Sequence, residues 1–274
     1  MITLHPYGGL ANRLRTIISA VSVATQSDQR LEIIWDENKD LNCPYSLLFK
    51  EISHFLFKKK TKKLRLLKSN NQSTVLRKIL ARIINQFVGY DYVIKEKDFS
   101  LYWKGNLNII EKSKRYKKVY IHTCEEFHED NKYYQLLRPV DELQARIDRI
   151  TNLFDRNTIG IHIRRGDNTE SVEKSPLGLF EEKIKNEIEQ NSSVKFYLAT
   201  DDLKVEQELF ERFGASRFIV IEKTLDRNTI SGIQDALVEM FCLSRTARIY
   251  GSYWSSFSAV SASIGGCGLE VVKN

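Results

Sequence analysis

The chain has 274 residues, enough for one large domain or two modest ones that each bury a core. With 42% hydrophobic and 28% charged residues it reads as a globular protein, and no run of about 18 apolar residues predicts a transmembrane helix. The net charge of +7 comes from one segment, because ten basic residues and no acidic one lie between Ile52 and Tyr90, and without them the charge is −3. The basicity is therefore a local patch and not a property of the whole chain.

The cysteines and the N-terminus bear on the compartment. Cys43, Cys124, Cys242 and Cys267 are widely spaced and form no Cys-x-x-Cys pair. We therefore expect buried free thiols, with no disulfide framework and no metal site. The N-terminus leads directly into an apolar segment without a signal-peptide pattern, so we expect a cytoplasmic protein.

The first elements predict a β-α-β unit of the doubly wound kind. Residues 2–7 are typical of a strand, 8–10 of a tight turn, 11–25 of a helix and 31–35 of a second strand. A glycine-rich turn that opens a helix can bring backbone N–H groups against an anion. We expect Gly9, Asn12 and Arg13 to face a ligand over this turn.

The basic segment carries an amphipathic pattern. Residues 75–87 predict a helix with apolar residues at helical spacing beside Arg77, Lys78 and Arg82. Such a helix can lie on an anionic membrane surface, so peripheral membrane contact through 58–87 is one interpretation. The alternative is that its apolar face packs on its own domain and its charges are merely solvated.

The middle of the chain predicts the passage to a second half. Residues 119–124 are typical of a strand, and an acidic loop follows at 125–130. Helical periodicity resumes over 139–154, and the second half opens with the next strand.

The segment 158–167, Thr-Ile-Gly-Ile-His-Ile-Arg-Arg-Gly-Asp, predicts a strand that passes into a loop. The alternation places His162 and Arg164 on one face, with Arg165 and Asp167 in the turn at the carboxyl end, where open α/β sheets bind ligands. Guanidinium groups match phosphate oxygens and keep their charge, so this turn suits a diphosphate, with Asp167 holding one arginine. The alternative is an ordinary surface ion pair.

After Asp167 we expect a polar loop that carries Glu170 and Glu173, followed by a helix from Pro176. Residues 195–200 predict a strand that ends at Asp201 and Asp202. This acidic pair can orient a sugar hydroxyl, coordinate a metal or cap the following helix, and the capping role is favoured because Asp is a preferred N-cap.

The C-terminal part predicts strands at 218–221 and 248–251 with a helix over 233–244 between them. In that helix Asp235 and Glu239 lie one turn apart on one face. The last strand leads into 252–258, Ser-Tyr-Trp-Ser-Ser-Phe-Ser, and then into a helix of small residues. Hydroxyl and N–H groups at such a helix start are suited to phosphate oxygens.

Four segments, in this order, resemble the motif set of the GDP-fucose-dependent fucosyltransferase superfamily, which includes the nodulation-factor, protein O- and α-1,2- or α-1,6-fucosyltransferases. They are residues 8–13 (Gly-Gly-Leu-Ala-Asn-Arg), 162–167 (His-Ile-Arg-Arg-Gly-Asp), 199–202 (Ala-Thr-Asp-Asp) and 255–258 (Ser-Ser-Phe-Ser). The stretch 35–49 is similar too, so the resemblance spans nearly the whole chain. Two features depart from it: Ala11 stands where relatives usually have Gly, and the basic segment has no counterpart.

The resemblance implies an α/β, GT-B-like fold with two Rossmann-like domains facing across a cleft. Residues 1–150 form the acceptor-side domain, with the basic insertion at about 55–90, and residues 151–274 form the donor-nucleotide domain. The implied reaction is an inverting transfer of fucose from GDP-fucose to a glycan or lipid-linked glycan hydroxyl, without metal or cofactor.

The resemblance also implies roles for individual residues. Arg164 contacts the diphosphate and stabilises the departing β-phosphate, assisted by Arg165 or Asp167. An acid in the helix before the serine loop binds guanine, with Glu239 ahead of Asp235. The full set of implied donor-binding residues is Gly9, Asn12, Arg13, His162, Asp201, Asp202, Asp235, Glu239, Ser255, Ser256 and Phe257.

The transfer reaction requires a cationic site. When the nucleoside diphosphate leaves the sugar, negative charge builds up on its oxygen, and cationic hydrogen-bond donors held in place stabilise that charge. Glu170, Glu173 and the Asp201–Asp202 pair are the candidate general bases by position, although either glutamate can be a surface acid in an ion pair. One alternative function is transfer from another nucleotide sugar, and another is a nucleotide-binding relative without activity. A third is nucleic-acid binding by the Lys58–Arg82 patch, in which aromatic stacking platforms are sparse, so no nucleic-acid partner is expected.

Overall fold

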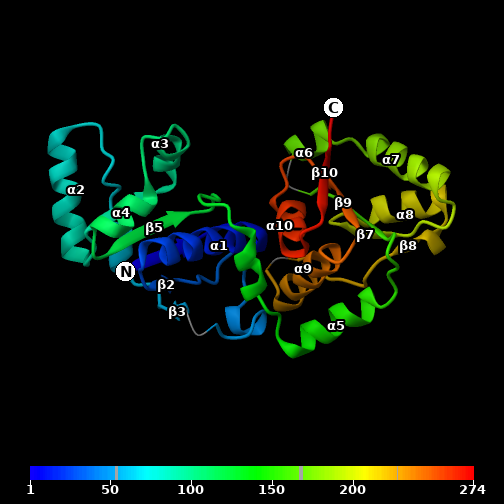
Figure 1. Ribbon diagram of the computed structural model, residues 1–274, viewed down its shortest axis with the longest axis horizontal. Helices are drawn as coiled ribbons and strands as arrows, with labels where there is room; N and C mark the ends of the chain where they lie inside the picture. The colour runs from blue at the N-terminus through cyan, green and yellow to red at the C-terminus, as the bar shows by residue number, and fades with distance from the viewer. Residues whose placement is uncertain (53–54, 167–168, 227) are drawn as a thin grey trace. The chain divides into compact units, whose positions relative to one another are not determined.

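The computed structural model describes residues 1–52, 55–166, 169–226 and 228–274. It consists of two compact units, Met1–Arg138 and Pro139–Asn274 (Figure 1). Helix α5 (Asp141–Thr151), which the sequence placed at the end of the first domain, belongs to the second unit because it packs against α9 (Ile230–Leu243).

The first unit contains a parallel five-stranded sheet in the order β3-β2-β1-β5-β4. Its strands are β1 (Ile2–Pro6), β2 (Leu31–Ile33), β3 (Phe55–Phe57), β4 (Tyr92–Lys95) and β5 (Val119–Thr123). Its helices are α1 (Leu10–Ser27), α2 (Val75–Val88), α3 (Phe99–Trp103) and α4 (Ile109–Arg115), with short 3-10 helices at Tyr45–Leu47, Lys62–Leu66, Glu96–Asp98 and Asn131–Leu136. The predicted strands and helices at 2–7, 11–25, 31–35, 75–87 and 119–124 are confirmed.

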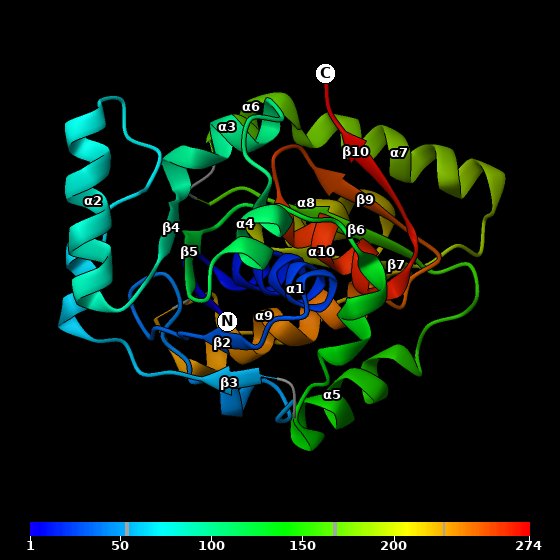
Figure 2. The same cartoon turned by 60° about the vertical axis from the view of Figure 1, so that its left-hand side comes forward.

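The second unit repeats this architecture with a parallel sheet in the order β10-β9-β6-β7-β8. Its strands are β6 (Ile159–Ile163), β7 (Phe196–Thr200), β8 (Phe218–Ile219), β9 (Arg248–Ser252) and β10 (Gly268–Val272). Its other helices are α6 (Thr169–Lys174), α7 (Leu177–Gln190), α8 (Leu203–Phe213), α10 (Ser256–Gly265) and the 3-10 helix Ala215–Arg217. Figure 2 shows the same elements turned by 60°.

The central strand β6 follows its predicted alternation. Ile159, Ile161 and Ile163 belong to a buried cluster with side chains of α7 and α8. His162, on the other face, stacks on Phe257 of α10. Both faces of β6 are therefore covered, as in doubly wound folds.

Each sheet changes winding direction at its first strand. After β1 the chain adds β2 and β3 on one side and places β5 on the other, and after β6 it adds β7 and β8 on one side and β9 on the other. Such switch points are where open α/β sheets bind ligands, outside the carboxyl ends of the strands. The turns after β1 and β6 are the two turns that the sequence analysis selected.

Two expectations about composition can be checked directly. All four cysteines are free, as predicted, but only Cys43 and Cys242 are buried, whereas Cys124 and Cys267 are half-buried. Over the part of the chain that the structure describes, no helix is both long and apolar enough to cross a membrane.

Candidate functional site

The carboxyl end of β6 presents Arg164 at the switch point of the second sheet. The backbone N–H of Arg164 donates to Ser252 Oγ, 3.0 Å away at the end of β9. Ser252 Oγ in turn donates to the carbonyl of His162 at 3.4 Å. This buried hydroxyl therefore ties the ends of the two strands together and fixes where the Arg164 side chain leaves the sheet.

Asp201, at the end of β7, braces the arginine turn. Its carboxylate accepts hydrogen bonds from the backbone N–H groups of Arg165 (2.7 Å) and Gly166 (3.1 Å). The same carboxylate lies 3.4 Å from Arg164 Nη1. Charge-assisted bonds to two successive N–H groups hold the turn in one conformation, so Asp201 has the supporting role that the sequence analysis gave to Asp167. Asp167 itself lies outside the described residues.

Arg165 is placed differently from Arg164. Its guanidinium donates to the carbonyl oxygens of Arg164 (3.0 Å) and Ser175 (2.9 Å). It thereby links the turn to the connection between α6 and α7. Two of its N–H donors are therefore used within the protein, and the assistance at the diphosphate stays a prediction.

His162 and Phe257 form an aromatic pair between β6 and α10. Their ring centroids are 4.8 Å apart with an interplanar angle of 21°. Burial lowers the pKa of His162 to about 3, so the ring is neutral at neutral pH. Its Nδ1 is buried and has no hydrogen-bond partner among the described residues. An unpaired buried ring nitrogen is rare in folded proteins and is suited to a polar ligand group.

The serine loop opens α10 at the same edge of the sheet. Ser255 is the N-cap residue, yet its side chain accepts no hydrogen bond from the described first turn of the helix. Trp254, just before it, has a positive φ of 52°, which is an outlier for a bulky side chain. Gly251 allows the close approach of α10 to β9, because a Cβ there would lie 2.5 Å from Ser258 Oγ. The first N–H groups of a helix and its dipole are suited to anions, so this helix start is a candidate phosphate contact.

Glu239 and Asp235 share one face of α9, as predicted, but have different partners. Glu239 pairs with the buried Lys223 at 2.7 Å. Burial raises the pKa of Glu239 to about 7, against the opposing effect of Lys223. Asp235 uses both oxygens, one for Arg146 of α5 at 2.6 Å and one for the N–H of Thr224 at 2.8 Å. Asp235, the second of the two candidate guanine-binding residues, therefore links α5 and the chain around Thr224 to α9.

The remaining acidic candidates lie on α8 and α6 or at their ends. Asp202 is the N-cap of α8, where its side chain accepts from the N–H of Lys204 at 2.9 Å, which confirms the favoured capping role. Glu170 and Glu173 are exposed on α6. The expectation of a polar loop at this point is wrong, because Thr169–Lys174 is helical.

In the first unit the turn after β1 has the predicted shape. Gly8 adopts a positive φ of 81° and Gly9 is the N-cap of α1, so the first N–H groups of the helix follow the carboxyl end of β1 directly. The side chain of Asn12 is half-buried beside Gly8.

Arg13 is fully buried and faces into the first unit. Its guanidinium donates to Gly8 O (2.8 Å), Asp36 O (2.6 Å) and Asn38 Oδ1 (3.2 Å), and it lies 5.1 Å from the ring centroid of Trp35. This corrects the expectation that Arg13 faces a ligand, because the side chain instead fixes the glycine turn to the chain that follows β2.

A cluster of titratable groups at the carboxyl edge of the first sheet escaped the sequence analysis. Glu96, after β4, accepts from the N–H of Cys124 at 3.1 Å and from the hydroxyl of Thr123. Candidate ligand atoms of Glu96, Cys124 and Glu125 lie within 4.8 Å of one another. Burial raises the pKa of Glu125. The acidic loop at 125–130 was visible in the sequence, but Glu96 follows a strand that was not predicted.

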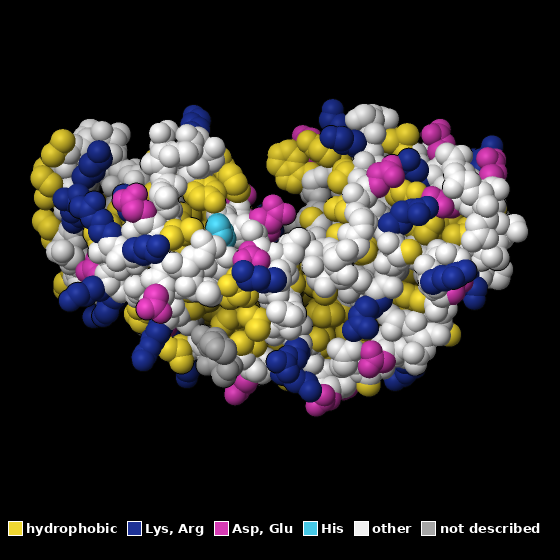
Figure 3. Space-filling view, in the orientation of Figure 1, with side chains coloured by type: hydrophobic (Ala, Val, Ile, Leu, Met, Phe, Trp, Pro, Cys, Tyr) yellow, Lys and Arg dark blue, Asp and Glu magenta, His cyan; other side chains and the backbone are white. Residues whose placement is uncertain are grey.

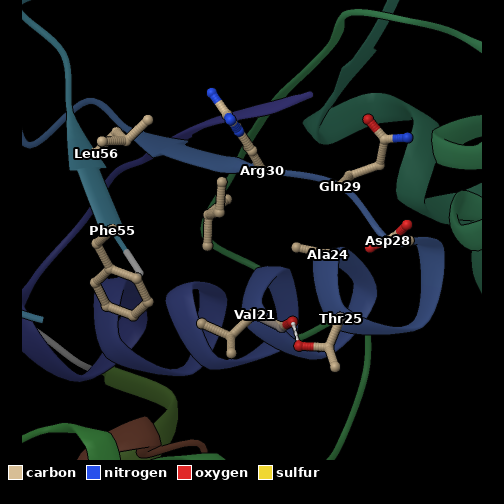
Figure 4. A pocket seen from close by; sticks show the side chains of 9 residues that line it. Val21, Ala24, Thr25, Asp28, Gln29, Arg30, Phe55 and Leu56 are labelled. Carbon is tan, nitrogen blue, oxygen red and sulfur yellow. Dashed lines mark hydrogen bonds between the residues drawn. The ribbon is translucent and has the colours of Figure 1, made fainter. Parts of the chain in front are cut away.

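The first unit also contains a pocket that no predicted site residue lines. It has a volume of about 460 Å³ and lies between the end of α1 and the first residues of β2 and β3 (Figure 4). The starts of parallel strands lie at the edge opposite to the Gly8 turn. This pocket therefore lies away from the switch point.

Comparisons with known proteins bear on the fold. Neither a protein-family model nor a curated protein sequence matches this chain. Among solved structures, a mutant of Arabidopsis thaliana FUT1 in complex with GDP matches with a TM-score of 0.65 and 14% identity, over 98% of this chain and 69% of that one. NodZ α-1,6-fucosyltransferase soaked with GDP-fucose matches with a TM-score of 0.62 and 17% identity, over 96% of this chain and 92% of that one.

The chain has the fold of these fucosyltransferases. POFUT1 in complex with GDP agrees, with a TM-score of 0.57 and 11% identity over 99% of this chain and 98% of that one. The predicted GT-B-like α/β class, with two Rossmann-like units, is thereby confirmed. At these identities the likeness concerns the fold, and the residues must carry the argument for activity.

Proposed function

We propose that the protein is an inverting glycosyltransferase that moves fucose from GDP-fucose to a hydroxyl of a glycan or lipid-linked glycan. One observation carries the proposal. At the switch point of the second sheet, Arg164, the open N-terminus of α10 and the His162–Phe257 pair lie at one edge, in a chain whose fold is that of fucosyltransferases solved with GDP.

The donor diphosphate is assigned to Arg164 and the start of α10. As the bond from the sugar to the β-phosphate breaks, negative charge grows on the leaving oxygen, and a guanidinium held there stabilises the transition state more than the ground state. The hydroxyls of Ser255 and Ser256 and the N–H groups of α10 bind the phosphate oxygens. Asp201 and Arg165 act as positioning residues that hold the arginine turn.

The guanine base is assigned to Phe257, His162 and Glu239. Phe257 offers a ring face for stacking, and the neutral His162 offers Nδ1 to the base or ribose. A carboxylate accepts two hydrogen bonds from the guanine edge, and a GDP preference over UDP follows from that pairing. Glu239 fills this role after Lys223 moves from it, whereas Asp235 is held by Arg146.

The acceptor side is assigned to the first unit, with Asn12 at the start of α1 as a proposed polar contact. Glu170 and Glu173 stay the predicted bases for the acceptor hydroxyl, and Glu125 joins them because its raised pKa favours proton transfer nearer to neutral pH. Gln variants of the three separate the candidates, since loss of the base removes the acidic limb of the pH–rate profile. Metal independence is part of the proposal and requires full turnover in EDTA.

The test is turnover with purified full chain. GDP release from GDP-fucose is measured beside GDP-mannose, UDP-sugars and dTDP-rhamnose, and each nucleotide is also screened by thermal shift, since a ligand at a hundred times its Kd stabilises by about 2.7 kcal/mol. The proposal expects the largest shift with GDP-linked sugars and fucose transfer with a suitable acceptor. A shift with another nucleotide class alone contradicts the donor assignment, and GDP binding without any turnover identifies an inactive nucleotide-binding relative.

A further inference from the structure

Helix α2 is attached to the first unit through Ala81 and Asn85 and, at its end, through Val88, which packs against a buried cluster. Asn85 is fully buried, and its amide accepts from the N–H of Lys68 (2.9 Å) and donates to Lys68 O (2.7 Å) and Asn70 Oδ1 (2.9 Å). Ala81, one turn earlier, is 2% exposed. A surface helix normally turns its apolar stripe toward the core, and α2 does the opposite.

The apolar stripe of α2 faces away from the unit. Leu76 is 76% exposed, Leu80 55% and Phe87 72%, and Ile79 and Ile83 are also exposed. At about 100° per residue these five positions fall within an arc of roughly 100° opposite Ala81 and Asn85. The alternative in which this face packs on its own domain is therefore wrong. Figure 3 shows the yellow stripe along the outer side of α2 with dark blue side chains beside it.

Cations lie on both sides of the stripe without matching acids. At about 100° per residue, Arg77 and Arg82 each fall roughly 60° beyond an edge of its arc, whereas Lys78 falls near Asn85 on the inner side. On α2 itself Arg77, Lys78 and Arg82 are exposed, and none has an ion-pair partner among the described residues. The chain just before the helix adds the exposed side chains of Lys59, Lys62, Lys63 and Arg65. Lys63 Nζ lies 5.8 Å from the ring centroid of Phe87, so this segment adjoins the stripe.

The charge of the surface decides what covers it. A second copy docked through the same face would bring these cations against their own kind, which opposes that symmetric association. An apolar stripe bordered by Lys and Arg has the composition of helices that lie in the interface of anionic bilayers, where the stripe enters the acyl boundary and the cations reach the phosphates.

We propose that α2 docks the protein on an anionic lipid bilayer, with the stripe of Leu76, Ile79, Leu80, Ile83 and Phe87 immersed and the cations of 59–65 and α2 at the headgroups. The helix lies flat on the surface and is already held in this orientation by Asn85, so docking needs no rearrangement of the unit. This inference does not depend on the proposed transferase activity, because lipid binding is measured without donor or acceptor.

The test is sedimentation of the full chain with large unilamellar vesicles. The expected result is binding to phosphatidylcholine vesicles with 30 mol% phosphatidylglycerol and little binding to pure phosphatidylcholine, with a loss in 0.5 M NaCl. Replacing Arg77 and Arg82 with Gln is expected to weaken binding by roughly 25-fold, since each cation beside the stripe contributes about 1 kcal/mol and 1.4 kcal/mol is tenfold. Leu80→Ser with Phe87→Ser is expected to weaken it by tenfold or more.

Matched controls use exposed residues of the second unit. Leu203→Ser on α8 and Lys185→Gln on α7 remove an exposed apolar and an exposed basic side chain away from α2, and both should bind as the unaltered chain does. Thermal unfolding shows that each variant is folded.

Three results overturn the proposal. The first is equal binding to anionic and neutral vesicles, or anionic binding that the Leu80→Ser, Phe87→Ser variant retains in full. The second is a dimer by light scattering that this variant converts to a monomer, since a second copy then covers the stripe. The third is no vesicle binding together with tight, salt-sensitive binding of single-stranded RNA, which would assign the patch to nucleic acid.

Discussion

The Arg164→Ala variant tests the site most sharply, because its effects on rate and on stability should separate. Removal of one fixed donor to a developing oxyanion slows the chemical step by about 100- to 1,000-fold, or roughly 2.7–4 kcal/mol. The loss of stability should be small. Arg164 and Asp201 are 3.4 Å apart, and in the variant Asp201 keeps its two backbone N–H donors, so we expect a loss of about 1 kcal/mol.

The assay compares kcat from GDP release with Tm from thermal unfolding. We expect kcat to fall by at least about a hundredfold while Tm changes by less than about 4 °C. Arg164→Lys keeps the positive charge but not the planar guanidinium, so its kcat should lie between those of Arg164→Ala and the unaltered chain. The control is Arg165→Ala, which removes the donor to two carbonyl oxygens and should lower stability by about 1–3 kcal/mol. A folded Arg164→Ala enzyme within tenfold of the unaltered kcat would refute the role given to Arg164.

Three further predictions follow from neighbouring contacts. Asp201→Asn should lower the free energy of unfolding by about 1.5–3 kcal/mol and weaken GDP binding in calorimetry, because two backbone N–H groups lose a charged acceptor. Asp202→Asn is the control, because Asn still caps α8, and it should change neither stability nor GDP binding. In the folded protein the buried His162 stays neutral, whereas in the unfolded chain it is protonated below pH 6.5. The free energy of unfolding of the second unit should therefore fall by roughly 1.4 kcal/mol per pH unit between pH 6.5 and pH 3. Urea unfolding at pH 7, 6 and 5 should show a smaller fall in His162→Asn, and an equal fall in that variant contradicts this. Arg13→Ala should destabilise the first unit by about 2–5 kcal/mol, because Gly8 O and Asp36 O lose their buried donor. The GDP affinity of the folded variant should be unchanged. A stable variant that no longer binds GDP would identify Arg13 as a ligand contact.

The parts of the fold that the sequence predicted are those with a strong local pattern. Strand β6 alternates isoleucines with small and polar residues, and α1 and α9 carry long apolar periodicities, so their existence follows from burial of one face. Among the edge strands, β8 was predicted at 218–221, but β3, β4 and β10 were not predicted. Strand β10, Gly268–Val272, is largely exposed and carries a glutamate, so it resembles a loop until its neighbour β9 supplies a hydrogen-bonding partner.

The sequence predicted which residues line the candidate site better than it predicted which of them contact one another. Motif spacing placed Arg164 after one strand and the serine loop after another, and these strands, β6 and β9, are neighbours in the sheet. Spacing could not tell that the Arg165 guanidinium donates to two backbone carbonyl oxygens, nor that Asp201, 36 residues from Arg165, braces the turn. Those assignments depend on contacts between distant parts of the chain, which a single sequence does not encode by pattern. The same holds for α2, whose apolar stripe is plain in the sequence while its outward direction depends on Asn85.

The most direct measurement is a calorimetric titration of the full chain with GDP and with UDP, repeated on Arg164→Ala and Phe257→Ala. The account predicts that GDP binds, that UDP binds at least tenfold more weakly, and that each substitution weakens GDP in a folded protein. Absence of GDP binding, or binding that neither substitution alters, would contradict the assignment of the donor site to the carboxyl edge of the second sheet.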